Sequence, residues 1–336
     1  MDKAPPKIGR YLVLRTLGRG ALGTVYLAND PLIDRAVAVK VLGEWFDSDE
    51  GRERFIREAR AAARLMHRNI VTIFDVADHE GQLFIAMEYI QGQTLRELIG
   101  RQQTVALTRK LEIVEDLCSA LAYAHKQGVV HRDIRPTNVM VDEEGVVKVL
   151  DFGISRIAGS GMTRQGALIG SLNYMSPEQV TGSLVDQRSD VFAIGALFYE
   201  LLSYRKAFEG NFQARHEIIY DDPRPLAELS PDVDGEIISI VARALEKDPD
   251  RRYQDLSQMR NDIARARRLT PGGRSDTTSV IEPGSVAAES GRREARELAR
   301  RRIANISESL NKAEGAFEAG DLEAAFAECE HAPARP

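Results

Sequence analysis

The chain has 336 residues, of which 43% are hydrophobic and 29% are charged, and its formal net charge is −6 at pH 7. These values are typical of a soluble globular chain with enough residues for a large core, and the lack of a basic surplus argues against a nucleic-acid-binding protein. The longest apolar run, Val191–Leu202, is too short to span a bilayer and is broken by Gly195 and Glu200, so we expect no transmembrane segment and a cytoplasmic location.

The amino-terminal part of the chain is predicted to form a small sheet with one helix. Three strands are expected between Tyr11 and Val41, because YLVLRTL and TVYLAND are rich in β-branched and aromatic residues on either side of a glycine-rich turn. A helix over Asp49–Met66 follows, since apolar residues recur there at helical spacing. Two further strands are expected near Val71–Val76 and Leu83–Glu88.

After a hinge at Met87–Gly92, the pattern becomes mainly helical. Helices are predicted at Thr94–Ile99, Thr108–Gln127, Arg188–Ser203, Asp234–Leu245 and Ser257–Leu269. A β-rich part followed by an α-rich part indicates an α+β fold.

The last part of the chain has a different composition. Residues 270–290 are dominated by Pro, Gly, Ser and Thr and are predicted to be a flexible linker. In residues 291–332, apolar residues four and three apart, with Gly320-Asp321 between two such stretches, predict a helical hairpin. Its string AFEAGDLEAAFAE is similar to the turn of a tetratricopeptide repeat, so a partial repeat and a generic or self-pairing hairpin are both open. Either form predicts binding of a partner or of a second copy of the chain.

Five short segments occur in a fixed order along the chain. They are GRGALGTV at Gly18–Val25, VAVK ending at Lys40, HRDIRPTN at His131–Asn138, DFG at Asp151–Gly153 and SPE at Ser176–Glu178. Each is a weak signal alone, but in this order they resemble the protein-kinase family over Tyr11–Leu269. The phrases GRGALGTVYLAND, HRNIV and GSLNYMSPEQ look most like its bacterial, eukaryotic-like (Hanks-type) serine/threonine branch.

The resemblance implies the bilobal protein-kinase fold. Its domain, residues 11–269, would follow an amino-terminal segment, residues 1–10. A β-rich N-lobe would cover residues 11–88 and a mainly α-helical C-lobe residues 93–269, with the helical hairpin as an appendage.

ATP would lie between these lobes, according to the same resemblance. Glycines without side chains let backbone amides approach phosphates, and a dinucleotide-binding loop is excluded because TVYLAND continues as a strand rather than a helix. Lys40 would contact the α- and β-phosphates, oriented by Glu58, with Glu53 as the alternative partner. Met87 is the expected gatekeeper at the hinge. The full set expected at the nucleotide is Gly18, Gly20, Gly23, Val25, Ala38, Lys40, Glu58, Met87, Glu88, Ile90 and Asp151.

The catalytic residues implied are Asp133, Lys40, Arg135 and Asn138. Asp133 would accept the proton of the substrate hydroxyl or orient that hydroxyl, while Asn138 and Asp151 would hold Mg²⁺, with Mn²⁺ as an alternative, through oxygen ligands. Arg135 stands where serine/threonine kinases usually have lysine, and some tyrosine kinases have arginine there. It keeps the positive charge near the γ-phosphate.

The segment between Asp151 and Glu178 is expected to regulate activity. In similar kinases the arginine before the catalytic aspartate, here Arg132, pairs with a phosphorylated loop. Thr163 is the first expected phosphosite and Ser160 the second. Ser171 retains the hydroxyl that would contact the catalytic loop.

Three residues are assigned structural roles from the resemblance. Glu178 is expected to pair with Arg252, and Asp190 to brace the backbone of the catalytic loop. Buried pairs of this kind are needed mainly for stability.

The function implied is transfer of the γ-phosphate of ATP to Ser or Thr hydroxyls of protein substrates, activated by autophosphorylation of the loop. A pseudokinase that binds nucleotide and partners is the alternative, but Lys40, Glu58, Asp133, Asn138 and Asp151 are all of the required type. A small-molecule phosphotransferase is disfavoured by the SPE segment and the long loop before it.

Overall fold

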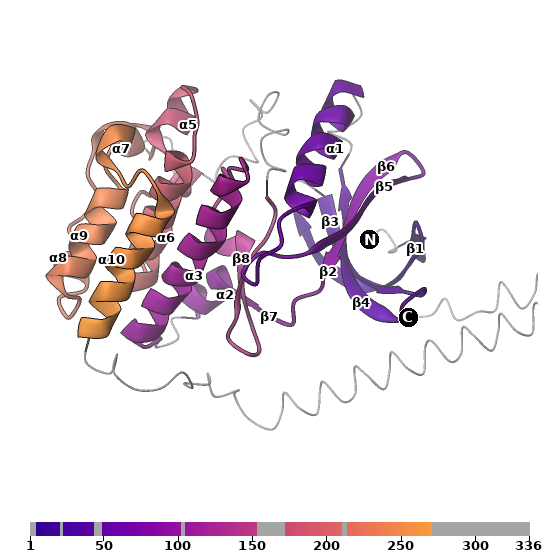
Figure 1. Ribbon diagram of the computed structural model, residues 1–336, viewed down its shortest axis with the longest axis horizontal. Helices are drawn as coiled ribbons and strands as arrows, with labels where there is room; N and C mark the ends of the chain where they lie inside the picture. Colours follow the sequence, from indigo (N-terminus) through magenta and orange to yellow (C-terminus); the bar gives the residue numbers. More distant parts are fainter. Residues whose placement is uncertain are drawn as a thin grey trace, which may run out of the picture. The chain divides into compact units, whose positions relative to one another are not determined.

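The structure is a computed structural model that describes residues 5–20, 23–43, 49–101, 105–152, 172–209 and 214–270 (Figure 1). Its amino-terminal lobe is an antiparallel sheet with strand order β1-β2-β3-β4-β6-β5. The strands are β1 (Lys7–Ile8), β2 (Tyr11–Gly20), β3 (Gly23–Asp30), β4 (Arg35–Leu42), β5 (Ile73–His79) and β6 (Gln82–Glu88). Helix α1 (Asp49–Ala63) lies beside the sheet and packs Phe55 and Ala59 into a core shared with Leu83 and Ile85.

The second lobe is mainly helical. Its elements are β7 (Gly92–Thr94), α2 (Leu95–Gly100), α3 (Leu107–Lys126), β8 (Val139–Asp142), β9 (Val147–Val149), α5 (Pro177–Thr181), α6 (Arg188–Ser203), α7 (Ala214–Tyr220), α8 (Leu226–Leu229), α9 (Gly235–Ala244) and α10 (Leu256–Leu269). Nearly every residue of α6 is buried, because α3 and α9 pack against it (Figure 1). The α6–α9 contact is so close that a Cβ added at Gly195 would lie 2.8 Å from Cβ of Ala244.

A small sheet, β7-β8-β9, carries the catalytic loop. Its strands have three or four residues. Strands this short are not detectable from periodicity, which explains why no boundaries were predicted for them.

The predicted end of helix α1 is wrong. The helix ends at Ala63 rather than Met66, and the bonds Arg64 N–Ala61 O and Leu65 N–Ala62 O close tighter turns after it. Met66 matched the helical spacing but is 82% exposed.

Strand β5 begins at Ile73 rather than Val71. The reason is that the backbone N–H of Val71 donates to the carbonyl of Val149 in β9, in the other lobe. By contrast, α6 has the predicted bounds.

In the part of the chain that the structure describes, no helix has both the length and the apolar character needed to cross a membrane. The cytoplasmic location stays a prediction. The predicted linker beyond Thr270 and the hairpin of residues 291–332 lie outside the described residues.

Candidate active site

The glycine-rich segment forms the hairpin between β2 and β3. Gly18 faces Val25 across this hairpin, and Gly20 faces Gly23. Gly23 has a φ of +135°, and a Cβ added there would lie 2.0 Å from the carbonyl oxygen of Val41, so only glycine fits. A Cβ at Gly18 or Gly20 would meet nothing within 4 Å. Packing does not demand glycine at those two positions, and the backbone of β2 stays accessible there.

Lys40 is buried in the middle of the sheet, where it pairs with Val25 on one side and Ile85 on the other. Its ammonium Nζ lies 2.7 Å from Oδ2 of Asp151. Asp151 has a φ of +60°, in the left-handed region. Burial acts to raise the pKa of Asp151, but the charge and hydrogen bond of Lys40 outweigh it and hold that pKa below its ordinary value.

The structure pairs Lys40 with Asp151. Orientation of Lys40 by Glu58, or by Glu53, stays a prediction. Asp151 is half-buried, and the pair with Lys40 offsets the cost of partly burying its carboxylate. Glu58 lies half-buried on α1, beside the fully buried Ala59.

The catalytic loop between α3 and β8 brings three predicted residues together. The amide Nδ2 of Asn138 donates to the backbone oxygen of Asp133 at 2.8 Å and to its carboxylate Oδ2 at 3.0 Å. Nε of Arg135 lies 3.5 Å from the same Oδ2. Burial raises the pKa of Asp133, although the charges of Arg135 and His131 and the hydrogen bond from Asn138 oppose the rise.

The donor set fits a hard cation. Since Nδ2 of Asn138 is turned to Asp133, its amide oxygen, which accepts a 3.4 Å contact from the Thr137 hydroxyl, is the ligand it offers. Asp151 supplies a carboxylate. Across the described residues, no group of three His, Cys, Asp or Glu side chains could hold a metal ion. Two oxygen ligands completed by phosphates and water match the preference of Mg²⁺.

Asp190 anchors the backbone of the catalytic loop from helix α6. Its Oδ2 accepts from the backbone N–H of His131 at 2.8 Å, and its Oδ1 from that of Arg132 at 2.7 Å. His125, a residue not predicted, lies 2.7 Å from Oδ2 through its Nε2. Burial acts to raise the pKa of Asp190, but these partners hold it below its ordinary value.

Three of the residues predicted at the nucleotide belong to one apolar cluster. Ala38 and Met87 are cross-strand neighbours and share an apolar cluster with Val25. Leu17 and Leu150 pack against the same cluster. Leu17 and Leu150 were not predicted, because the sequence does not distinguish an apolar residue beside a motif from an ordinary residue of the hydrophobic core.

The hinge residues Glu88 and Ile90 were both predicted to contact the nucleotide. The side chain of Glu88 is bound by Nζ of Lys148 at 2.8 and 3.0 Å and by the backbone N–H of Thr72 at 3.2 Å, so it is directed away from a nucleotide role. Glu88 would therefore act through its backbone. Ile90 is 9% exposed.

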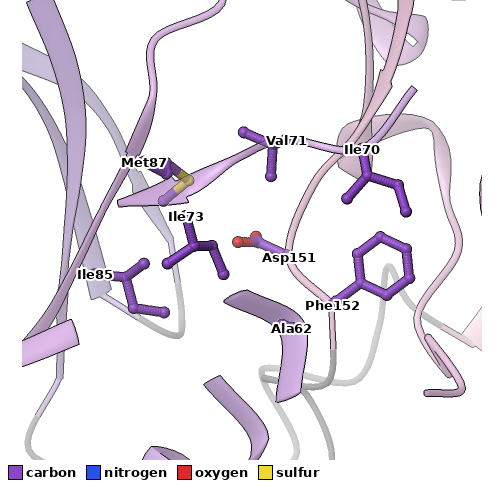
Figure 2. Close-up of a pocket in the computed structure, with 8 residues that line it drawn as sticks. All are labelled: Ala62, Ile70, Val71, Ile73, Ile85, Met87, Asp151 and Phe152. Atoms are coloured by element: carbon purple, nitrogen blue, oxygen red, sulfur yellow. The ribbon is translucent and has the colours of Figure 1, made fainter. Parts of the chain in front are cut away.

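A small pocket lies behind Met87 (Figure 2). Figure 2 shows Asp151 between Ile73 of the sheet and Phe152. The pocket is lined by Ala62, Ile70, Val71, Ile73, Ile85, Met87, Asp151 and Phe152. Phe152 packs on the ring of His131 with centroids 4.7 Å apart, a contact between two of the motifs that spacing alone did not predict.

Glu178 and Arg252 form a bidentate ion pair that is almost completely buried. Nη1 and Nη2 of Arg252 lie 2.8 and 2.9 Å from the two carboxylate oxygens of Glu178. The hydroxyl of Ser189 donates to the same carboxylate at 2.5 Å. This pair joins the start of α5 to the turn before α10.

Of the predicted regulatory residues, the structure describes only Arg132. Its φ is +69°, which is uncommon for a residue other than glycine. Ser160, Thr163 and Ser171, together with Gly153 of the DFG segment, lie outside the described residues.

With this geometry established, comparison with known proteins decides the family. A model described as the protein kinase domain matches residues 11–262. The chain belongs to the protein kinase family. The β-rich and helical lobes described above are the two lobes of that fold, as its motifs predicted.

Its relatives are bacterial serine/threonine-protein kinases. PknB of Mycolicibacterium smegmatis is 40% identical over 266 residues, covering 76% of this chain and 43% of PknB. PrkC of Bacillus subtilis is 37% identical over 264 residues, covering 77% of this chain and 40% of PrkC. The chain therefore spans less than half the length of these relatives.

A solved structure supports the fold. The kinase domain of Mycobacterium tuberculosis PknI matches with a TM-score of 0.64 and 30% identity, covering 79% of this chain and 100% of that one. Together these similarities identify a kinase of the bacterial Hanks-type serine/threonine branch.

Proposed function

We propose that this protein kinase transfers the γ-phosphate of ATP to Ser or Thr hydroxyls of protein substrates. The observations that carry the proposal are the Asn138–Asp133 and Lys40–Asp151 contacts and the bond that joins them: the backbone N–H of Leu150, next to Asp151, donates to the carbonyl of Asn138 at 2.9 Å. Lys40 and Asp151 are 111 residues apart in sequence yet in direct contact.

In this reaction the substrate hydroxyl oxygen forms a bond to the γ-phosphorus, and the bond from that phosphorus to the β–γ bridging oxygen breaks. Asn138 and Arg135 both approach Oδ2 of Asp133, so we assign Oδ1 to the substrate hydroxyl. The raised pKa of Asp133 favours acceptance of the hydroxyl proton as the new bond forms. ADP leaves with the electron pair of the broken bond.

We assign the remaining charges to the phosphates. Lys40 would bind the α- and β-phosphates, and Arg135 an oxygen of the γ-phosphate, while the hairpin of Gly18, Gly20 and Gly23 would offer backbone N–H groups. A bound Mg²⁺, or Mn²⁺, held by Asn138 and Asp151, would neutralise phosphate charge. Val25, Ala38, Met87, Ile90 and the backbone of Glu88 would hold the adenine.

We further propose that the kinase phosphorylates its own segment between Asp151 and Glu178, and that this autophosphorylation raises its activity. Support comes from Arg132, which directly precedes the catalytic Asp133 in the sequence and carries a guanidinium of the kind that makes charge-assisted hydrogen bonds to phosphate. Thr163 is the first candidate site and Ser160 the second.

Residues 291–332 are proposed to bind a partner or a second copy of the chain. Light scattering of the full chain and of a variant ending at residue 290 would test this.

The decisive experiment for activity is phosphate transfer from radiolabelled ATP to a protein substrate. Asp133→Asn and Lys40→Met should each reduce transfer by at least about 10²-fold. Asp142→Asn is the matched control, because Asp142 only accepts backbone hydrogen bonds in the β8–β9 turn. A pseudokinase would show no transfer that depends on Asp133, and this result would overturn the proposal.

A further inference from the structure

The side chain of Gln179, which is one residue after Glu178, contacts two segments at once. Its amide oxygen Oε1 accepts from the backbone N–H of Ser176 at 2.9 Å and from the Ser176 hydroxyl at 3.2 Å, which caps helix α5. Its amide Nε2 donates to the backbone oxygen of Arg132 at 2.8 Å. The second contact reaches the catalytic loop, 47 residues earlier in the chain.

The Arg132 oxygen belongs to the peptide unit that leads into Asp133. The N–H of that same unit, on Asp133, is directed to Nδ1 of His131 at 3.2 Å. Nε2 of His131 donates to the carbonyl of Leu150 at 2.7 Å, so the ring is the tautomer whose Nδ1 accepts. Both ends of the peptide unit are therefore held by side chains, Gln179 at the oxygen and His131 at the N–H.

The backbone at this point needs such support. Arg132 has a φ of +69°, a conformation that L-residues with a Cβ rarely adopt and that persists only where surrounding contacts hold it. Asp190 fixes the N–H of Arg132 at 2.7 Å, but it has no contact with the oxygen on the other side. The amide of Gln179 donates to that oxygen.

We propose that Gln179 is a positioning residue for phosphate transfer: its amide N–H fixes the peptide unit that sets the direction of the Asp133 side chain. The inference rests on the proposed function of Asp133. It also connects α5, which begins directly after Ser176, to the backbone that carries Asp133. Movement of α5 would change the orientation of Asp133 without any contact with substrate.

The two ends of the Gln179 amide allow positioning to be separated from helix capping. Gln179→Glu keeps an oxygen that can accept from Ser176 but replaces the Nε2 donor with a second oxygen facing the Arg132 carbonyl. Ser176→Ala removes the cap and keeps the donor. Gln187→Glu is the matched control, because Gln187 also donates through Nε2 to a carbonyl, that of Gln254 at 2.8 Å.

The test is steady-state phosphate transfer by the full chain, with thermal unfolding of each variant. Gln179→Glu should lower kcat by about tenfold to 10²-fold, since small misplacements of a catalytic group have effects of this size. Its KM for ATP should stay within about twofold, because the nucleotide contacts are unchanged. Ser176→Ala should lower the unfolding temperature, and Gln187→Glu should match wild type.

The pH dependence of kcat separates positioning from a purely structural role, because a purely structural role of Gln179 would leave the ratio of variant kcat to wild-type kcat independent of pH. A carboxyl group has a pKa of about 4.3 in model peptides, and a carbonyl neighbour raises it. Below about pH 6 a growing fraction of the introduced carboxyl is protonated and again donates to the Arg132 oxygen. The ratio of Gln179→Glu kcat to wild-type kcat should therefore rise as pH falls. Taking the ratio at each pH removes the titration of Asp133, which both proteins share.

Each outcome decides the matter. An active wild type with an unchanged kcat in Gln179→Glu, or a reduced kcat whose ratio does not rise at low pH, overturns the positioning role. If Gln179→Glu does not fold, Gln179→Met, which has neither donor nor charge, takes its place, and an unchanged kcat in that variant also overturns it. A wild type without transfer overturns the proposed function itself, which is a distinguishable result.

Discussion

Removing Arg252 should destabilise the kinase fold more than any exposed arginine substitution. Arg252 is 1% exposed. All five N–H groups of its guanidinium donate: two to Glu178 at 2.8 and 2.9 Å, and one each to the carbonyls of Glu246, Arg188 and Lys247 at 2.7 to 3.0 Å. The side chain is therefore a fully satisfied buried charge, which is the situation in which losing one partner is most destabilising.

The magnitude follows from what each variant leaves behind. Glu178→Gln removes one charge of a buried pair, which corresponds to about 3–5 kcal/mol. Arg252→Met leaves the Glu178 carboxylate buried with the Ser189 hydroxyl and also leaves three carbonyls without their donor, so its loss should lie at or above about 5 kcal/mol. The double variant should lose less than the sum of the two, because no unpaired charge remains.

Urea unfolding followed by circular dichroism would measure these differences. Arg251→Met is the matched control, because Arg251 is the preceding residue, is 68% exposed and pairs with Glu246 at 3.2 Å; such a pair contributes about 0–1 kcal/mol. If Arg252→Met were no more destabilising than Arg251→Met, the reasoning from burial and satisfied hydrogen bonds would be refuted.

Two other contacts give predictions of different kinds. Asp190→Asn should lower kcat by about 10²-fold, because a side-chain amide has one oxygen for the two backbone N–H groups of His131 and Arg132; kinetics showing kcat within about twofold of wild type would contradict this. Burial lowers the pKa of Lys247 from 10.5 to about 8, so the unfolded state binds more protons between about pH 8 and about pH 10.4. The contribution of Lys247 to stability should therefore rise with pH across that window. The measurement is the difference in unfolding free energy between wild type and Lys247→Met. If that difference stays constant from pH 7 to pH 10, this prediction is wrong.

The sequence was sufficient to predict the elements and residues that depend on local pattern. Runs rich in β-branched and aromatic residues predicted the first long strands, and a continuous apolar sequence of helical length predicted α6 with the correct ends. The catalytic set was identified because motif residues occur within short segments, as for Asp133 and Asn138, whose side chains are 3.0 Å apart. In these cases the information lies within a few neighbouring positions.

Partner choice could not be predicted in the same way. Lys40 had carboxylates available on α1 and in the DFG segment, and which of them it contacts depends on how α1 and Asp151 are placed around it. The sequence pointed to Glu58 and did not predict the direct contact with Asp151, whose Oδ2 lies 2.7 Å from Nζ of Lys40. Similarly, the start of β5 depends on the bond from Val71 to Val149 of β9, a contact between the lobes that no local pattern encodes.

Gln179 shows why the remaining contacts of the catalytic loop escape sequence analysis. The loop between α3 and β8 has little regular secondary structure, so its backbone polar groups are satisfied by side chains from elsewhere: Asp190 of α6 on two N–H groups, and Gln179 of α5 on the Arg132 oxygen. Nothing in the sequence distinguishes a glutamine directly after the SPE segment from an ordinary surface residue. Its role is visible only from its tertiary contact with the Arg132 oxygen. Since such contacts hold Asp133 in place, the geometry of the reacting groups is determined by residues that never touch the substrate. We therefore expect variants at these supporting positions to change kcat while leaving the KM for ATP largely unaltered.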